Sequence, residues 1–251
     1  MKAGRRLLAL AGLSLSGMLA AGCGVQGSSG TGTSADSWSG PAVMQALQHL
    51  PNYSLTESVL EAYDLGAVAY SQDGVYSGRN YREDITGKAK SLAFMGATSL
   101  IFAGGHYYID VTAPPAPGFQ AGWYDIGPQP TGPYADVLQN FDQIGRAWRV
   151  RLAGSTATAA GSCSAAGRKG IAWRVKFLLP TGMTAQSAYG TACTDKKTGA
   201  PLAINFSYVG SDASGQPATF SDHFRVTAVG SMGPVTAPAG AAPAPKVSYA
   251  P

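Results

Sequence analysis

Several segments of this 251-residue chain carry an apolar residue at every second position. Successive side chains of a β-strand point to opposite faces, so this spacing leaves one face apolar and the other polar. Strands of that kind form antiparallel sheets that are buried on one side only. The alternation is found in four segments: 148–152, 171–179, 202–208 and 220–226. The chain is therefore predicted to be mainly β.

The segment 148–152 shows how the pattern is interpreted. Trp148, Val150 and Leu152 would lie on the apolar face of a strand, and Arg149 and Arg151 on its polar face. Charged residues make up only 13% of the chain. A coiled coil is excluded by that share, because its outer faces need dense charge.

Two segments have apolar residues at helical spacing instead. Each segment has its own stripe of four apolar residues: Val43, Met44, Leu47 and Leu50 in 41–50, and Val137, Leu138, Phe141 and Ile144 in 133–144. Pro133 near the start of the second segment and Gly145 just after it are typical of helix ends. Two helices are therefore predicted.

Segment 54–63 has two interpretations. Ser54 and Glu57 have the spacing of a capping box, which predicts a third helix. A long first strand over 53–71 is the alternative. Glu57 and Glu61 could share a helix face, but both are expected to be solvated surface carboxylates.

The predicted strands offer many apolar faces, and only two helices are available to cover them. A closed barrel would bury these faces against one another. A curved open sheet with helices across its mouth would leave an apolar hollow, which is the usual setting of a small-ligand site. The residues expected to line that hollow are Leu138, Phe141, Ile144, Trp173 and Phe177.

The amino terminus has the features of an export signal. The apolar run over 7–19 follows three basic residues, Lys2, Arg5 and Arg6. This run is too short to cross a bilayer core, which requires about 20 apolar residues in a helix. Small residues then lead directly to Cys23, and the sequence Leu-Ala-Ala-Gly-Cys over 19–23 resembles the bacterial lipobox. That resemblance implies removal of a signal peptide, 1–22, and diacylation of Cys23. The alternative is an ordinary secretory signal followed by an incidental cysteine.

Two acyl chains would anchor the protein stably to the extracytoplasmic side of the cell membrane, where one chain would hold it only marginally. The expected organisation is a lipidated Cys23 with a Gly/Ser tether to residue 40, one β-rich domain over 41–230, and a Pro/Ala-rich disordered tail over 231–251. Without the signal peptide, the chain has 15 basic and 14 acidic residues. No basic stripe is present, so a nucleic-acid partner is not expected. The protein is expected to be a monomer.

The three cysteines fit this organisation. If Cys23 carries lipid, Cys163 and Cys193 remain, and an exported protein is expected to join them in a disulfide. Two free thiols or a metal pair are the alternatives. No CxxC motif is present and the three histidines are scattered, so neither a zinc site nor any other metal or cofactor is predicted.

Motifs that carry enzyme chemistry are missing from the sequence. The chain has no GxSxG, HExxH, P-loop or GxGxxG pattern. Lys197-Thr198-Gly199 matches a triplet of penicillin-binding proteins, but no SxxK accompanies it. The protein is therefore not expected to be an enzyme.

The order of the segments resembles that of LppX/LprG-type envelope lipoproteins and the wider LolA/LolB-like lipoprotein-carrier superfamily. The resemblance rests on the lipobox and tether, a hairpin over 99–111, the segment 122–126, a helix around 134–144, and the hairpin turn 195–201 that leads into 202–208. The last strand, 224–229, is followed by a Pro-rich tail, as in these proteins.

This resemblance implies an antiparallel half-barrel whose concave face is closed by helices and whose hollow holds acyl chains. The implied function is to bind or carry a lipid or another apolar ligand at the membrane. The alternative is an envelope sensor or scaffold of the same fold that binds another protein and has a filled core.

Overall fold

The computed structural model describes residues 38–63, 66–87, 97–112, 120–141, 143–179, 183–212 and 214–246. They all belong to one compact unit, Ser34–Pro251. The predicted signal peptide, Cys23 and the tether up to residue 37 lie outside the described residues. The side chains of 142–147 lie outside them as well.

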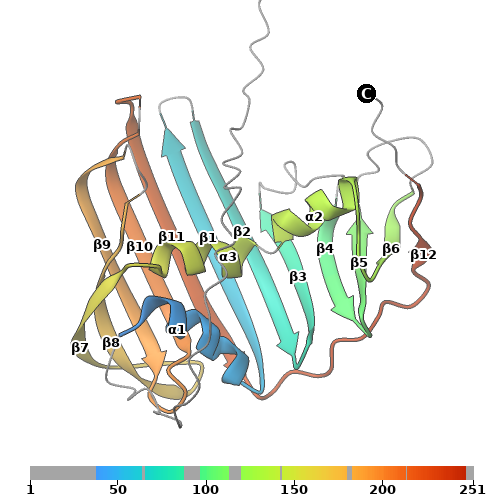
Figure 1. The fold of residues 1–251 in the computed structure, drawn as a ribbon, viewed down its shortest axis with the longest axis horizontal. Helices are drawn as coiled ribbons and strands as arrows, with labels where there is room; N and C mark the ends of the chain where they lie inside the picture. The colour runs from blue at the N-terminus through green and yellow to red at the C-terminus, as the bar shows by residue number, and fades with distance from the viewer. Residues whose placement is uncertain are drawn as a thin grey trace, which may run out of the picture. The chain divides into compact units, whose positions relative to one another are not determined.

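One sheet of twelve strands dominates the structure (Figure 1). Its order is β12-β6-β5-β4-β3-β2-β1-β11-β10-β9-β8-β7, and every neighbouring pair is antiparallel except β12 and β6. The strands are β1 Asn52–Tyr63, β2 Gly66–Ser77, β3 Asn80–Gly87, β4 Ala97–Ala103, β5 His106–Val111, β6 Gly122–Gly127, β7 Thr156–Ala165, β8 Arg168–Lys176, β9 Thr184–Asp195, β10 Pro201–Ser211, β11 Pro217–Val229 and β12 Ala242–Pro243.

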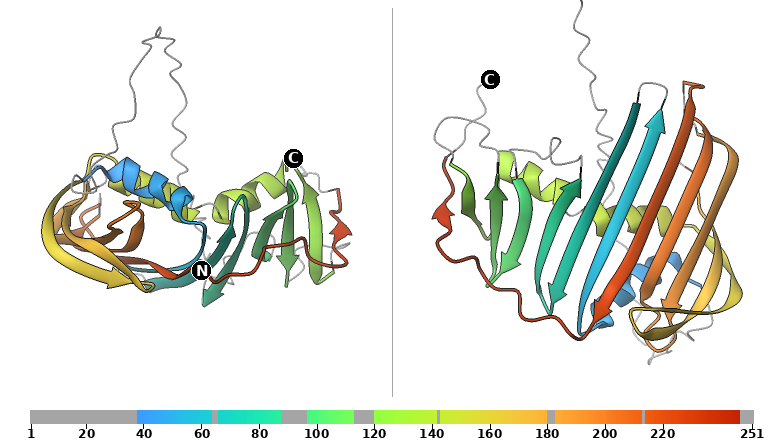
Figure 2. Two further views of the ribbon diagram at one scale, coloured as in Figure 1. Left: turned by 90° about the horizontal axis from the view of Figure 1, so that it is seen from below. Right: turned by 180° about the vertical axis from the view of Figure 1, so that it is seen from behind.

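Four helical segments lie on one face of this sheet (Figure 2): α1 Gly40–Gln45, the 3-10 helix η1 Ala46–His49, α2 Pro133–Phe141 and α3 Gln143–Leu152. The sheet curls around them most strongly at the β7 end, where β7 also contacts β10 and β11. The predicted class, a curved antiparallel half-barrel with a few helices on its concave face, is confirmed.

The alternating pattern correctly predicted the strands of this curled half. In β10, Leu202, Ile204, Phe206 and Tyr208 are all buried, while Asn205 is exposed. β8 behaves in the same way, although it ends at Lys176, before the predicted end at Leu179. Alternation is informative here because one face packs on the helices and the other faces water.

The strand predicted over 148–152 is wrong, because these residues belong to helix α3. Residues four apart share a helix face, so Trp148 and Leu152 are both fully buried there. Val150 lies on the opposite side and is 70% exposed.

The helices also differ from the prediction in number. Two helices were predicted, and the structure has three α-helices and a 3-10 helix. Gly145, which was predicted to follow a helix end, lies inside α3.

Segment 54–63 is a strand, as the second interpretation held, but the long strand over 53–71 is not continuous. β1 ends at Tyr63 and β2 begins at Gly66, and the two pair along their whole length. β1 also pairs with β11 on its other side, which makes it a central strand. Hydrogen bonding of β1 to β2 and β11 outweighs the helix preference that the capping-box spacing indicates, because that spacing reflects only local sequence.

The disordered tail predicted from residue 231 is corrected by the structure as far as Lys246. Val235 is buried against Ile101 and Ala103, and its carbonyl accepts a hydrogen bond from the Asn80 side chain at 3.0 Å. Further on, β12 pairs with β6, and the hydroxyl of Tyr134 donates to the Pro245 carbonyl at 2.7 Å. An extended Pro-rich segment loses little backbone freedom on docking, so one buried valine and a few hydrogen bonds place it along the sheet.

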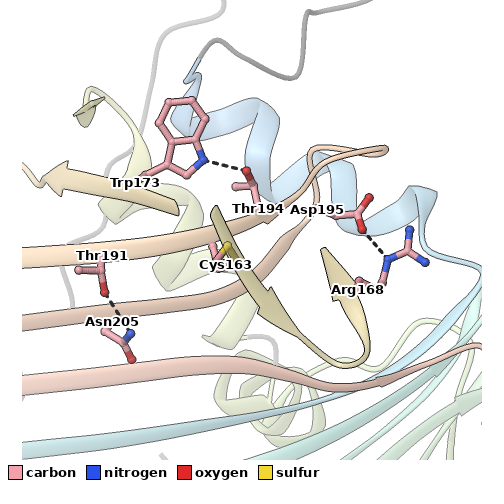
Figure 3. Close-up of a disulfide and its surroundings, with 8 residues drawn as sticks. Cys163, Arg168, Trp173, Thr191, Thr194, Asp195 and Asn205 are labelled. Atoms are coloured by element: carbon pink, nitrogen blue, oxygen red, sulfur yellow. Dashed lines mark hydrogen bonds and ion pairs between the residues drawn. A yellow bond between two sulfur atoms is a disulfide. The ribbon is translucent and has the colours of Figure 1, made fainter. Parts of the chain in front are cut away.

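The predicted disulfide between Cys163 and Cys193 is confirmed (Figure 3). It joins β7 to β9, with β8 between them in the sheet order. The bond passes over Gly170 of β8, where an added Cβ would lie 2.9 Å from each sulfur. A glycine at this position therefore lets the two outer strands approach, and the crosslink holds the curl of the sheet at its β7 edge.

Replacing both cysteines, Cys163→Ser and Cys193→Ser, is expected to lower the free energy of unfolding by about 3–4 kcal/mol, because the crosslink no longer restricts the unfolded chain. Urea denaturation of the variant, compared with the wild-type protein under oxidising and reducing conditions, measures this. Equal midpoints for the variant and the oxidised wild type would contradict the assigned role.

Candidate functional site

A cavity of about 370 Å³ lies between helix α3 and the strands β10 and β11. Its floor is formed by Phe206, Tyr208, Ala218 and Phe220, which follow one another on the concave faces of the two strands. Helix α3 and the segments around β8 and β9 supply the remaining walls, from Val150, Arg151, Ala153, Phe177, Leu178, Leu179 and Met183. Arg151 is the one charged residue among them.

Aromatic packing builds the inner wall of this cavity. The ring of Phe177 lies 4.7 Å from that of Phe206, which lies 5.7 Å from that of Phe220. Phe177 reaches this position by resting directly on Gly190 of β9, where an added Cβ would come within 2.0 Å of the ring. A side chain at position 190 would therefore push Phe177 out of the wall.

The rim of the cavity exposes two large apolar side chains. Val150 is 70% exposed and Leu178 is 63% exposed. Leu178 follows the end of β8, and Val150 occupies the outer side of α3. Apolar side chains gathered at the mouth of an apolar cavity mark a surface that gains by contact with another apolar body.

A buried ionic cluster holds α3 against the sheet beside this cavity. Glu57 of β1 and Asp222 of β11 lie on the apolar concave face and are 3% and 0% exposed. Arg151 of α3 forms an ion pair with Asp222, and its guanidinium lies 4.6 Å from the ring centre of Phe220. Removing one member of such a buried pair leaves an uncompensated charge, which costs about 3–5 kcal/mol.

Burial raises the pKa of Glu57 from its ordinary value of 4.5 to about 7. The Arg151 charge and the indole N–H of Trp148 act in the opposite direction, but desolvation outweighs both. The expectation that Glu57 is a solvated surface carboxylate is wrong. Its strand is central in the sheet, and position 57 shares the concave face with Leu55 and Val59.

A second buried polar group lies next to the first on the same face. The side-chain amide of Gln72 in β2 donates to Glu83 of β3 at 3.0 Å and to the carbonyl of Phe141 at 2.9 Å. Phe141 is the last residue of α2, so Gln72 satisfies a carbonyl that the helix end leaves without an internal partner. The hydroxyl of Tyr76 donates to the other oxygen of Glu83 at 2.5 Å.

The residues predicted to line the hollow are not gathered at one cavity. Phe177 lines the cavity beneath α3. Trp173 instead packs near the disulfide and donates to the hydroxyl of Thr194 at 2.8 Å (Figure 3). Phe141 and Leu138 belong to a separate cluster under α2, and the side chain of Ile144 lies outside the described residues.

Sequence reasoning missed the floor of the cavity. Phe206, Tyr208 and Phe220 stand on the apolar faces of segments whose alternation was recognised, so that pattern could have indicated them. Val150 and Arg151 could not be found in this way, because segment 148–152 was interpreted as a strand.

Within the part of the chain that the structure describes, no three His, Cys, Asp or Glu side chains gather as metal ligands would. In the same part of the chain, no helix has the length and apolar character needed to cross a membrane.

Comparison with known proteins assigns no family. No family model matches the chain. A search of curated proteins finds no match either. Among solved structures, MucB in the Pseudomonas aeruginosa MucA/MucB complex is 16% identical, with a TM-score of 0.28 over 81% of this chain. A second structure of MucB is 16% identical, with a TM-score of 0.29 over 82% of this chain. The chain spans 56% and 60% of the length of these two MucB chains.

Two further similar structures are shorter. A DUF1329 family protein from Desulfovibrio piger is 10% identical, with a TM-score of 0.25, over 74% of this chain and 90% of that one. A putative outer membrane lipoprotein-sorting protein domain from Vibrio parahaemolyticus is 7% identical, with a TM-score of 0.23 and the same coverages. At these identities and TM-scores, none of the four similarities places the chain in a superfamily.

The raised pKa of Glu57 predicts that stability depends on pH. The folded protein binds the Glu57 proton more tightly than the unfolded chain does. The contribution of this proton to the free energy of unfolding is therefore complete below pH 4.5 and is lost as the pH rises through 7. Between about pH 5 and pH 7 the free energy of unfolding should fall by up to about 1.4 kcal/mol per pH unit. Asp195, whose pKa is lowered to about 2, titrates below this window.

Urea denaturation across this range measures the slope, and Glu57→Gln should reduce it. Asp73→Asn, which neutralises an exposed carboxylate of β2, is the matched control and should keep the wild-type slope. A Glu57→Gln variant with the wild-type slope would show that Glu57 does not titrate as described.

Proposed function

We propose that the protein is an envelope lipoprotein that binds the apolar part of a lipid or a similar molecule in the cavity beneath α3. The observation that carries the proposal is an apolar cavity whose mouth is bordered by Val150 and Leu178, both largely exposed. Its volume of about 370 Å³ lies in the range of about 300–1,000 Å³ that is common for small-ligand pockets.

Burial of hydrocarbon would drive this binding. Each methylene removed from water contributes about 0.8 kcal/mol, so even a short segment of an acyl chain binds usefully in an apolar cavity. The rings of Phe177, Phe206 and Phe220 pack on one another and would offer such a chain a continuous apolar wall. The bound molecule would also cover the exposed rim.

The proposed location follows from the sequence. A diacylated Cys23 would anchor the protein on the extracytoplasmic side of the membrane, and the Gly/Ser tether would leave the β-rich unit free to meet membrane lipids. The proposed role is binding or carriage by a monomer without enzymatic chemistry.

A sensor or scaffold that binds another protein is the second candidate. The observation that favours it is β7, the last strand in the sheet order, which pairs with β8 alone among the strands that the structure describes. Most of its side chains are exposed, small and uncharged. An uncharged edge strand can accept an added strand from a partner, and β7 lacks the charges and prolines that usually prevent this.

Ligand binding is tested with the fluorescent apolar probe N-phenyl-1-naphthylamine. Ala153→Trp places an indole at the mouth of the cavity and should weaken binding of the probe by about tenfold or more. This is the loss of affinity expected when the indole prevents burial of an apolar surface equal to about two methylene groups. Thr219→Trp, at an exposed position on the other face of β11, is the control and should bind like the wild type. Equal affinity in all three proteins would contradict the proposed site and leave the second candidate favoured.

Membrane anchoring is tested separately by Cys23→Ala. This variant should lose incorporation of a clickable palmitate analogue and move from the membrane to the soluble fraction, because both acyl chains are attached through Cys23. In-gel fluorescence and fractionation measure the two effects. Labelling that persists in Cys23→Ala would contradict the anchor.

A further inference from the structure

A second cavity, of about 690 Å³, lies on the other side of the ionic cluster, between α1, η1 and the strands β1–β3. The order of residues along β11 shows the separation. Ala218 and Phe220 line the cavity beneath α3, Phe224 lines the second cavity, and the buried Asp222 lies between them. The two cavities are therefore distinct sites on one concave face.

One part of the wall of the second cavity is apolar. It consists of Met44, Leu47, Leu50, Leu55 and Phe224. Tyr53 and Tyr76 extend this wall as a stacked pair, with ring centres 4.7 Å apart and planes 11° apart. This part of the cavity suits a short hydrocarbon chain.

The rim of the same cavity is cationic. Arg79, in the turn between β2 and β3, and Arg149, on α3, both line the cavity and are exposed. Neither arginine forms an ion pair with any residue in the described part of the chain. His49, at the end of η1, lies on the same rim.

The single acid in the wall is buried and already engaged. Glu83 is 5% exposed and accepts hydrogen bonds from Tyr76 and Gln72. Its negative charge at the inner wall disfavours an anion there, while the two arginines favour one at the rim. A ligand with an anionic head and an apolar tail would satisfy both conditions in one orientation.

We propose that this second cavity binds an anionic amphiphile, with its phosphate or carboxylate on Arg79 and Arg149 and its alkyl chain on the apolar wall. Guanidinium groups bind such oxyanions through paired, charge-assisted hydrogen bonds. The site does not depend on the proposed function, because it shares no lining residue with the cavity beneath α3. A lipid headgroup and a free phosphate present the same anion, and the two differ in the attached chain.

Isothermal titration calorimetry of the full chain with three probes tests the proposal. n-Octyl phosphate carries both the anion and the chain, n-octyl glucoside carries the same chain without charge, and inorganic phosphate carries the anion alone. We expect n-octyl phosphate to bind at least about tenfold more tightly than either of the others, since each lacks one of the two contacts.

The double variant Arg79→Gln, Arg149→Gln should weaken binding of n-octyl phosphate by about tenfold or more. Arg174→Gln with Arg225→Gln removes the same charge from exposed positions outside both cavities and should leave binding unchanged. Ala153→Trp should also leave it unchanged, which separates this site from the cavity beneath α3.

Four results would overturn the proposal. Wild-type affinity in the Arg79/Arg149 variant, or an equal loss in the Arg174/Arg225 control, would remove the arginines from the site. Inorganic phosphate that binds as tightly as n-octyl phosphate would leave an anion site with no role for the apolar wall. Loss of n-octyl phosphate binding in Ala153→Trp would place the amphiphile beneath α3 instead.

Discussion

The contact between Arg151 and Asp222 determines how α3 lies across the concave face. A sheet with one apolar face needs helical cover, and α3 lies across the middle of that face, where Glu57 and Asp222 are buried. Such charges add little net stability compared with apolar residues, but they specify position strongly, because any other placement of α3 would leave them unpaired. The two cavities lie on either side of this contact.

The amount of helical cover explains why cavities are present. The curled half of the sheet presents the aromatic faces of β8, β10 and β11, and α1 and α3 are short. Trp148 and Leu152 fill part of the space between α3 and the sheet, while Val150 remains exposed at the mouth of the cavity beneath α3. That cavity is bounded by Phe177, Phe206 and Phe220 and is closed by no other described helix.

Sequence reasoning was most successful where one face of a strand is buried and the other is wet. The alternation in 202–208 identified β10, and the cysteine count identified the disulfide. It failed at 148–152, because five residues are too few to separate a period of two from a helical turn with buried ends. The burial of Glu57 could not be predicted either, because it depends on the strands that flank β1. One of them, β2, pairs with β1 through a hairpin, and the other, β11, lies far along the chain.

Native mass spectrometry of the protein, extracted gently from the membrane, tests the central claim most directly. If the cavity beneath α3 holds an apolar ligand, the native mass should exceed the mass of the same sample measured under denaturing conditions, which retains only covalent acyl chains. Ala153→Trp should reduce that excess, and Thr219→Trp should keep it. Identical native and denatured masses for the wild-type protein would contradict the account.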